Sequence, residues 1–396
     1  MKYKDTLLWK KLEGNISVKN QHAMESLCDA AITMLKTVRD TFPTYTLHDE
    51  VHVVNVIHAI ENLLGEEGIG KLTEGETELL LLAACYHDIG MCYSKQEKQS
   101  ELNSIRFKRY LEQHPSADVL MFENEGEIPA KIQVDFFRSI HHERIAKILK
   151  DSLDVSNVRR DRLIKVCQSH GENIERVKEI PYDNFNEIDY CFCAVLLRLG
   201  DILDFDVTRS PEILYEYQKI EDAQDRQSVI EWRKHQSSLG FRYPKQASRD
   251  ALAFRAVSNS MQTEHFIHMF LDYIDLELRN CSEVISNNCS DRWRNLALPI
   301  QIDRSGIESN GYRTGEYHLT MDSERVLELL VGNDLYTHSA VFIRELLQNS
   351  LDAIGTRRML DRNYGFDSWM KEKPSVVITT WMDPDGNDWL RVDDNG

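Results

Sequence analysis

The feature that most restricts the fold of this chain is a series of histidine and aspartate residues placed at the ends of apolar helical segments. The densest apolar run, Leu79–Tyr86, predicts a buried helix, and His87 and Asp88 follow it directly. Another apolar run, Tyr190–Leu199, is followed closely by Asp201. A polar or charged group beside a buried helix needs a partner, and a divalent metal ion is one of the best. We therefore expect helices that converge on a metal site.

The apolar spacing changes at about residue 205. Before this point the period is helical, and after it strands and helices are mixed. The pattern predicts strands at 296–302, 316–321, 375–381 and 388–392 and helices at 322–330 and 339–360, and it leaves 252–257 and 265–273 open between strand and helix. The turn sequence DPDGN between the last two strands is typical of a hairpin. We expect three parts: a mainly α core over 1–210, a connector with helices and short strands over 211–300, and an α/β part over 301–396.

The composition argues against some classes of protein. The chain has 396 residues, a formal net charge of -18 and 42% hydrophobic residues. This balance suits a folded acidic protein and gives no strong signal for nucleic-acid binding, because phosphate contacts need clustered Lys and Arg. No apolar segment is long enough to span a membrane, and the N-terminus does not look like a signal peptide. With eight Cys residues and no pair of CxxC motifs, we expect reduced thiols and a cytoplasmic protein.

The candidate metal site consists of imidazoles and carboxylates that lie in or beside the apolar segments. In chain order they are His48, His52, His87, Asp88, His141, His142, His170 and Asp201. Mixed ligation of this kind suits manganese, iron, nickel, zinc or magnesium and does not choose among them. Two such ions, roughly 3.5–4 Å apart, would hold a hydroxide and stabilise the attacking and leaving oxygens of a phosphoryl transfer. One or two divalent ions are therefore the expected cofactors.

Five segments in this order resemble the HD-domain phosphohydrolases. They are YTLHDEVHVVNV, AACYHDIG, RSIHHERIAKIL, CQSHG and LLRLGDILDF, and together they span roughly residues 40–210. The resemblance implies a helical bundle that hydrolyses a phosphoester with bound metal. The chain resembles most closely the bacterial HD domains that are fused to a chaperone-type ATPase, which occur among anti-phage and stress proteins.

The resemblance also implies roles for the metal ligands. His52 resembles the first ligand, and Asp201 matches the closing aspartate. His87 and Asp88 match the dipeptide that names the family, and Asp88 would bridge two metals. His170 resembles one of the extra histidines that let some members bind a second metal.

Other roles stay open at the level of sequence. Either His141 or His142 is the partner of His170, and we favour His141. His48 resembles the histidine that protonates the leaving oxygen in cyclic-nucleotide members, a role that needs a pKa near neutrality, or it only begins a helix. Arg198 would bind a substrate phosphate or form a structural ion pair, and the ion pair is the favoured reading.

The segment FIRELLQNSLDAI, residues 342–354, carries the second candidate site. Glu345, Asn349 and Asp352 are spaced four and three apart and so share one helix face. The stretch resembles the first helices of the GHKL ATPases, which include gyrase and the ninety-kilodalton heat-shock chaperone. The resemblance implies that Glu345 activates water, that Asn349 binds the magnesium of Mg-ATP, and that Asp352 supports the adenine end.

The last residues, RVDDNG, resemble the start of the adenine-binding box of the same ATPases. Asp394 would accept the adenine amino group, and Asn395 and Gly396 would begin the loop beneath the nucleotide. The later motifs of that domain are absent from the sequence, so we expect an incomplete α/β sandwich that binds ATP weakly, in a chain that is a fragment of a longer protein.

Two functions of different classes follow. In the first, the protein is a metal-dependent phosphohydrolase that acts on a nucleotide or a nucleotide-derived phosphoester and is coupled to an ATP-binding module, in stress or anti-phage defence. In the second, it is a chaperone-like or signalling ATPase, and the HD region senses a ligand or acts as a scaffold. Homo-oligomers are compatible with both.

Overall fold

The computed structural model describes residues 2–114, 117, 128–150, 160–222, 226–243, 251–313, 341–364, 373–384 and 386–395. The chain forms two compact units, Met1–Thr314 and Gly315–Gly396, and each is considered by itself. The strand predicted at 316–321, the helix predicted at 322–330 and Gly396 lie outside the described residues. The divisions expected at residues 210 and 300 remain predictions. None of the described helices combines the length and apolar character needed to cross a bilayer.

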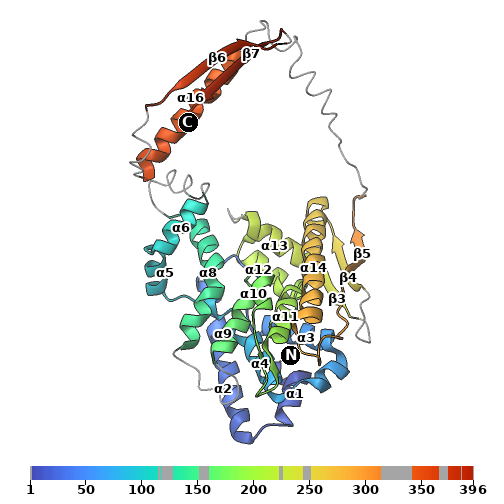
Figure 1. Ribbon diagram of the computed structural model, residues 1–396. Coiled ribbons are helices and arrows are strands. Elements are labelled where there is room, and N and C mark those ends of the chain that lie inside the picture. The colour runs from blue at the N-terminus through green and yellow to red at the C-terminus, as the bar shows by residue number, and fades with distance from the viewer. Residues whose placement is uncertain are drawn as a thin grey trace. The chain divides into compact units, whose positions relative to one another are not determined.

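Helices dominate the first unit (Figure 1), as the apolar period predicts. They are α1 (Leu7–Glu13), α2 (Val18–Leu35), α3 (Glu50–Lys71), α4 (Glu74–Tyr86), α5 (Lys95–Leu102), α6 (Ile105–Gln113), α8 (Ala130–Lys150), α9 (Arg160–Ser169), α10 (Ile174–Lys178), α11 (Tyr190–Ile202), α12 (Glu212–Tyr217), α13 (Arg226–Ser237) and α14 (Met261–Asn288). Short 3-10 turns lie at η1 (Tyr3–Asp5), η2 (Val38–Asp40), η3 (Ile89–Met91), η4 (Val207–Arg209) and η5 (Ile220–Asp222).

Two central helices, α4 and α11, carry the apolar runs that lead to the candidate ligands. A capping box formed by Thr73 and Glu76 begins α4, whose residues from Glu76 to Tyr86 are all buried. The side chain of Asp189 accepts a hydrogen bond from the backbone of Phe192 and so begins α11, which is buried through Gly200. Helices that are apolar on every face lie inside a bundle. The polar residues at the C-terminal ends of α4 and α11 therefore lie in the interior as well.

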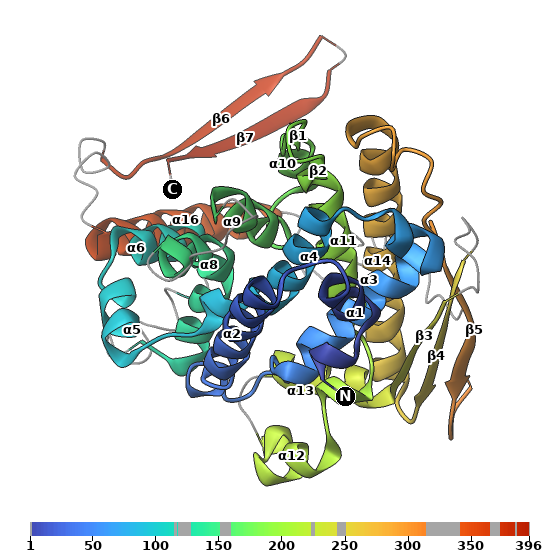
Figure 2. The same cartoon turned by 90° about the horizontal axis from the view of Figure 1, so that it is seen from below.

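A small mixed sheet accompanies α14. It contains β3 (Ser238–Arg242), β4 (Leu252–Ser258) and β5 (Ile302–Ser309) in the order β3-β4-β5, with an antiparallel first pair and a parallel second pair. Figure 2 shows α14 between this sheet and the helices of the bundle. The region 252–257, which the sequence leaves open, is therefore a strand, and 265–273 is part of a helix. A two-residue ladder pairs β1 (Tyr182–Asp183) with β2 (Ile188–Asp189).

The strand predicted at 296–302 is wrong, because the strand begins only at Ile302. The apolar residues before Ile302 pack in the core and are not part of a strand. Leu298 is fully buried, and the ring of Trp293 stacks on Phe192 of α11 at 4.0 Å between centroids. Pro299 also lacks the backbone N–H that a strand ladder needs.

Residues beyond 210 share their core with the bundle. The buried carboxylate of Glu76 accepts hydrogen bonds from the backbone N–H of Asp189 at 3.1 Å and from Trp293 Nε1 at 3.2 Å, and it pairs with Arg292 at 3.1 Å. The first unit therefore includes α14 and the segment that follows it as structural parts.

The second unit contains α16 (Val341–Tyr364) and an antiparallel hairpin of β6 (Val376–Met382) and β7 (Asp388–Asp394). The hairpin predicted from DPDGN is confirmed, and Gly386 in its turn adopts a φ of 85°, which favours glycine. Ser350 and Ile354 are buried among the α16 side chains that the structure describes. A helix beside a hairpin is compatible with an α/β sandwich, which otherwise remains a prediction.

Candidate metal centre

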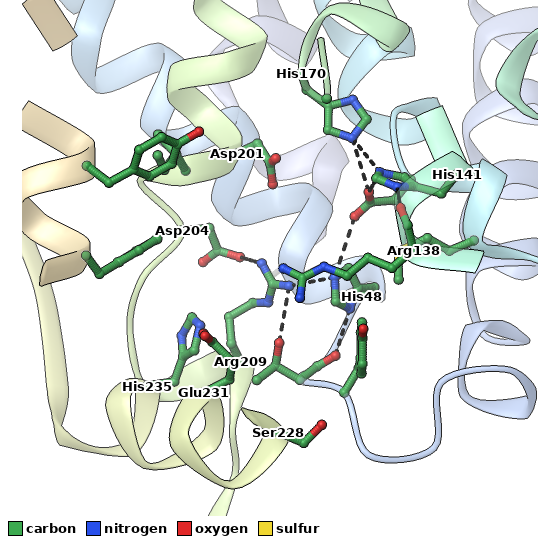
Figure 3. A pocket seen from close by; sticks show the side chains of 18 of the residues that line it. His48, Arg138, His141, His170, Asp201, Asp204, Arg209, Ser228, Glu231 and His235 are labelled. Carbon is green, nitrogen blue, oxygen red and sulfur yellow. Dashed lines mark hydrogen bonds and ion pairs between the residues drawn. The ribbon is translucent and has the colours of Figure 1, made fainter. Parts of the chain in front are cut away.

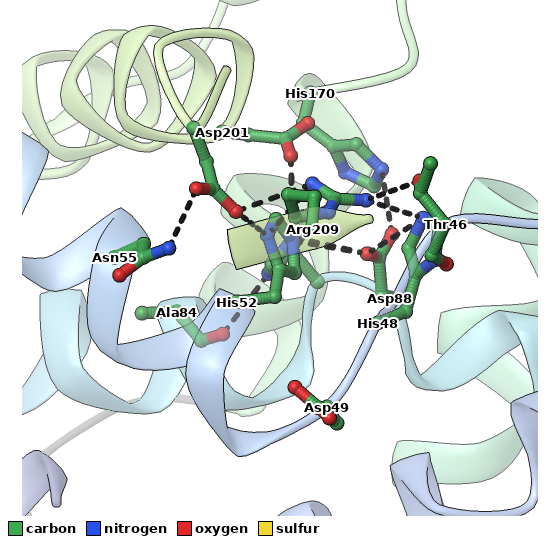
Figure 4. Close-up of polar contacts among 12 residues, drawn as sticks. Thr46, His48, Asp49, His52, Asn55, Ala84, Asp88, His170, Asp201 and Arg209 are labelled. Carbon is green, nitrogen blue, oxygen red and sulfur yellow. Dashed lines mark hydrogen bonds and ion pairs between the residues drawn. The ribbon is translucent and has the colours of Figure 1, made fainter. Parts of the chain in front are cut away.

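Three helix ends meet at a first group of ligand atoms (Figure 4). His52 lies in α3, His87 and Asp88 directly follow α4, and Asp201 lies in the last turn of α11. The Nε2 atoms of His52 and His87 are 3.0 Å apart, and Asp88 Oδ2 is 3.3 Å from each. Asp201 Oδ1 lies 3.5 Å from His52 and 3.7 Å from His87. The atoms of His52, His87 and Asp88 all lie within 4.8 Å of one another, and Asp201, the predicted closing ligand, lies beside this group without belonging to it.

The other oxygen of Asp88 faces a second group. His141 of α8 and His170, which follows α9, place their Nε2 atoms 2.9 Å apart (Figure 3). Asp88 Oδ1 is 3.8 Å from His141 and 3.7 Å from His170. The Asp88 carboxylate therefore stands between two imidazole pairs and offers one oxygen to each.

Two glycines allow the helices to come this close. A β-carbon on Gly200 would lie 3.0 Å from the backbone oxygen of Val56 in α3, so glycine lets α11 approach the helix that carries His52. A β-carbon on Gly90 would overlap the backbone oxygen of His141. The backbone next to Asp201 therefore packs against α3, which carries His52. The backbone next to Asp88 packs against α8, which carries His141.

Hydrogen bonds fix the same tautomer in all four imidazoles. Each Nδ1 lies close to an acceptor: Asp204 Oδ2 for His52 at 2.6 Å, the Ala84 carbonyl for His87 at 3.0 Å, the Arg138 carbonyl for His141 at 2.6 Å and the Cys167 carbonyl for His170 at 2.5 Å. The proton therefore resides on Nδ1, and the Nε2 lone pair points into the cluster. This is the arrangement in which a second hydrogen-bonded partner orients a metal-ligating histidine.

In each imidazole pair the two Nε2 lone pairs face one another, and a cation between them, either a proton or a metal ion, relieves their repulsion. For His87, burial opposes protonation, but Asp88 and Asp201 raise the pKa well above its usual value, so a proton can fill this position. Burial and the His170 ring lower the pKa of His141 to about 4, and burial and the His87 ring lower the pKa of His170. Both rings are therefore neutral near pH 7, which is the form in which an imidazole binds a metal ion.

The donor set fits divalent metal. Two groups of the described residues have ligand atoms close enough to share an ion, one of His52, His87 and Asp88 and one of Asp88, His141 and His170. Two nitrogens bound to one ion at about 2.1 Å and at right angles lie about 3 Å apart, which agrees with the 3.0 and 2.9 Å separations. Ions held there would supply a Lewis acid and a hydroxide.

A cavity of about 320 Å³ opens beside the cluster (Figure 3). One wall is formed by the bundle and includes His48, Arg138 and Asp201. The opposite wall is formed by α13 and α14, which contribute Glu231, His235, Phe270, Tyr273 and Glu277. The region after residue 210, which carries no recognisable motif, therefore shapes the site.

Comparison with known proteins agrees with this geometry. A family model described as HD-CE matches residues 42–280, which is more than half of the chain. The chain belongs to the HD-CE family. Neither the curated proteins nor the solved structures give a match. The HD-CE match takes in both imidazole pairs and the α13 and α14 wall of the cavity.

A shell of polar residues supports the ligands of this HD-CE domain. Asp204, which binds the Nδ1 of His52, accepts a further hydrogen bond from Asn55 at 2.8 Å. Arg209 lies 3.3 Å from Asp204 and 2.9 Å from the same His52 nitrogen. We infer that the Nδ1–H of His52 donates to Asp204, because this contact is shorter than the one with Arg209 and an ionised carboxylate can only accept. Asn55 follows His52 by three residues on α3, a spacing that could have suggested it from the sequence.

His48 lies before α3, whose N-cap is Asp49, so helical spacing does not place it beside His52. The rings are nevertheless 5.6 Å apart. The Nδ1 of His48 donates to the Thr46 carbonyl at 2.7 Å, and its Nε2 accepts from Arg209 at 3.0 Å. Burial and the charge of Arg209 lower the pKa of His48 to about 3. In this arrangement His48 is neutral at pH 7, and its general-acid role remains a prediction.

The remaining candidates of the first unit lie apart from the ligand atoms. The ring of His142 packs against Gly171, and only His141 of the doublet joins the cluster. Arg198 is buried and pairs with Glu277 at 2.9 Å. Although Arg198 lines the cavity, this pairing gives it a structural partner.

The candidate ATP residues lie in the second unit. Glu345, Asn349 and Asp352 are exposed along one side of α16, and Gln348 donates to Asp352 at 2.9 Å. Asp394 ends β7 and is exposed. Asn395 donates to the Lys373 carbonyl at 3.0 Å. Their roles in nucleotide binding remain predictions.

Proposed function

We propose that this HD-CE protein is a metal-dependent hydrolase that cleaves a phosphoester of a nucleotide or a nucleotide derivative. The observation that carries the proposal is the position of Asp88, whose two carboxylate oxygens each face an imidazole pair. A carboxylate between two ions is the arrangement that two-metal phosphoryl transfer requires. Mixed nitrogen and oxygen ligation leaves the choice of divalent metal open.

Two arginines of the cavity could bind the phosphate of a substrate, although carboxylates also line the cavity. The side chains of Arg138 and Arg209 both line the cavity. Arg138 lies over the ring of Tyr45 at 5.5 Å and is exposed, so it can reach a ligand. Guanidinium groups bind phosphate oxygens with strong, oriented hydrogen bonds.

The opposite wall offers apolar surface for the rest of the substrate. Tyr273 is half exposed and lies beside Phe270 on α14, and both line the cavity. Aromatic side chains provide a stacking surface for a base. A nucleotide could therefore place its phosphate at the ligand cluster and its base against α14.

A nucleotide panel with added manganese tests the proposal. Wild-type protein should release a phosphate or cleave a phosphodiester from at least one nucleotide, and His87→Ala and Asp88→Ala should lose that turnover by two or more orders of magnitude. Asp40→Asn, an exposed change outside the cavity, is the matched control. Equal turnover in the wild type and in both ligand variants would refute the proposal.

We further propose that the second unit contributes to ATP binding. The exposed carboxylate and amide groups of Glu345, Asn349 and Asp352 share one side of α16, which suits a Mg-ATP site. Calorimetric titration with Mg-ATP should give weak binding that Asp394→Asn reduces further. Tight binding that is indifferent to Asp394→Asn would contradict this assignment.

The alternative, in which the HD region is a sensor or a scaffold, makes a different prediction. The protein would then be inactive on every nucleotide, and its oligomeric state would change with ATP. Sedimentation with and without Mg-ATP, run beside the nucleotide panel, separates the two functions. Metal-dependent turnover without any response to ATP favours the hydrolase.

A further inference from the structure

Arg198 connects three elements at the edge of the metal centre. It lies in α11, one turn before Asp201, and it is 7% exposed. Its guanidinium is surrounded by acceptors from the end of α9, from the segment that follows α9 and from α14. A buried guanidinium has five N–H donors that need acceptors, and here the acceptors tie the turn beside His170 to α14.

On one side, Arg198 binds the backbone that carries His170. Its Nη1 donates to the carbonyl of Ser169, to the carbonyl of Glu172 at 2.6 Å and more distantly to that of His170 at 3.5 Å. Three carbonyls around one guanidinium nitrogen fix the turn that presents the His170 ring. The position of His170 relative to Asp201 therefore depends on Arg198.

On the other side, Glu277 of α14 holds Arg198. Glu277 Oε2 accepts from Arg198 Nε at 3.2 Å and from Nη2 at 2.9 Å. Both residues are largely buried, so the removal of one partner leaves the other as a buried charge without its partner. Tyr273 of the cavity wall lies one turn before Glu277 on the same helix.

We propose that Arg198 is a positioning residue of the second metal position and that Glu277, through Arg198, makes α14 a part of the metal centre. The inference rests on the metal centre of the proposed function. It assigns to the region after residue 210 a role in holding His170 toward Asp88 and His141. No contact among the described residues joins Arg198 to His52 or His87. Metal binding at the first position should therefore be independent of Arg198.

A substitution of Arg198 or Glu277 should weaken the binding of one metal ion and leave the binding of the other unchanged. Residues that orient a ligand typically change metal affinity by about 10–100-fold. Manganese titration of the metal-free full chain, followed by elemental analysis, should give two equivalents in the wild type. In Glu277→Gln one equivalent should weaken by about 10–100-fold while the other is unchanged. Arg198→Lys, which keeps the charge but not the fork of donors, should show the same pattern.

Two reference variants make the result specific. His141→Ala removes a ligand of the second position and should lose the same equivalent that Glu277→Gln weakens. Glu283→Gln changes an exposed glutamate of the same helix and should bind both equivalents as the wild type does. Thermal unfolding of each variant shows whether it is folded.

The inference is overturned if folded Glu277→Gln and Arg198→Lys bind both equivalents normally, or if both equivalents weaken to the same extent. A wild type that binds two ions but hydrolyses no nucleotide would instead contradict the proposed function and leave the positioning role standing. Metal affinity therefore tests the inference separately from turnover.

Discussion

At the residue scale, the four imidazoles of the centre are held through their Nδ1 atoms, on the side of each ring away from the cluster. Asp204 is the only carboxylate among these acceptors, and its contact with His52 is 2.6 Å. A carboxylate in this position fixes the tautomer and increases the basicity of the ligating nitrogen. The strength of the first metal position should therefore depend on a residue outside the ligand set.

Asp204→Asn keeps the size of the side chain but removes its charge. We expect metal affinity at the first position to fall by about 10–100-fold, with the fold retained. Manganese titration measures this, and Asp40→Asn serves as an exposed control. Unchanged affinity in Asp204→Asn would show that His52 is oriented by other means.

A second residue-scale prediction concerns His235. Burial and the nearby charge of Arg209 lower its pKa to about 3, whereas an unfolded chain has a histidine pKa of about 6.5. Between these values the unfolded state binds the extra proton, so the free energy of unfolding must fall as the pH falls from about 6.5. His235 packs on Phe205 and is not a ligand.

The measurement is chemical denaturation of metal-free protein between pH 7 and 4. His235→Phe should show a shallower loss of stability on acidification than the wild type, whatever its stability at pH 7. His22→Phe, at an exposed position of α2, should keep the wild-type slope. Equal slopes in all three proteins would show that His235 is not buried in the neutral form.

The sequence predicted the clustered histidines and aspartate better than the residues that support them. His52, His87 and Asp88 belong to an ordered series of histidines and aspartates that is visible in the sequence. Arg209 acts through contacts with His48 and His52 that span more than 150 residues, and no local pattern records such pairings.

At the element scale, close backbone packing sets the distance between the two ligand groups. Gly90 touches α8 at His141, two residues after Asp88. Gly90→Ala must push α8 away, so we expect a loss of about 1–3 kcal/mol in stability and weaker binding at the second metal position. Thermal unfolding and metal titration check both effects.

Gly70→Ala is the matched control, because a β-carbon there meets no atom within 4 Å. It should leave the metal affinity unchanged and should stabilise or not affect the helix. If Gly90→Ala behaved like Gly70→Ala, the close contact between the turn and α8 would not control the site.

The elements that the sequence misjudged are those decided by tertiary packing. The run before Ile302 has the apolar character of a strand, but Leu298 and Trp293 use that character to fill the core. The helices α4 and α11 could be predicted because each contains a dense apolar run, which is typical of a helix that is buried on all sides.

At the scale of the whole molecule, the first unit does not end where the ligand series ends. The face of α14 toward the bundle buries Ile267, Leu271, Ile274, Leu278, Cys281, Val284 and Ile285. Each large aliphatic side chain contributes about 1.5–3 kcal/mol when fully buried. A chain of residues 1–210 would expose the surface of α11 that these residues cover.

We therefore expect a chain of residues 1–210 to be unstable, whereas a chain of residues 1–314 unfolds cooperatively. Circular dichroism during thermal unfolding compares the two. A cooperative transition of residues 1–210 at the temperature of the longer chain would show that α14 is dispensable for the fold.

We infer that Asp88 would bridge two metal ions. Electron paramagnetic resonance of the metal-free protein reconstituted with manganese tests it most directly, because two ions on one carboxylate are magnetically coupled and separate ions are not. We expect two manganese ions per chain with a coupled spectrum, which Asp88→Asn abolishes. An uncoupled spectrum in the wild type, or no bound manganese, would contradict it.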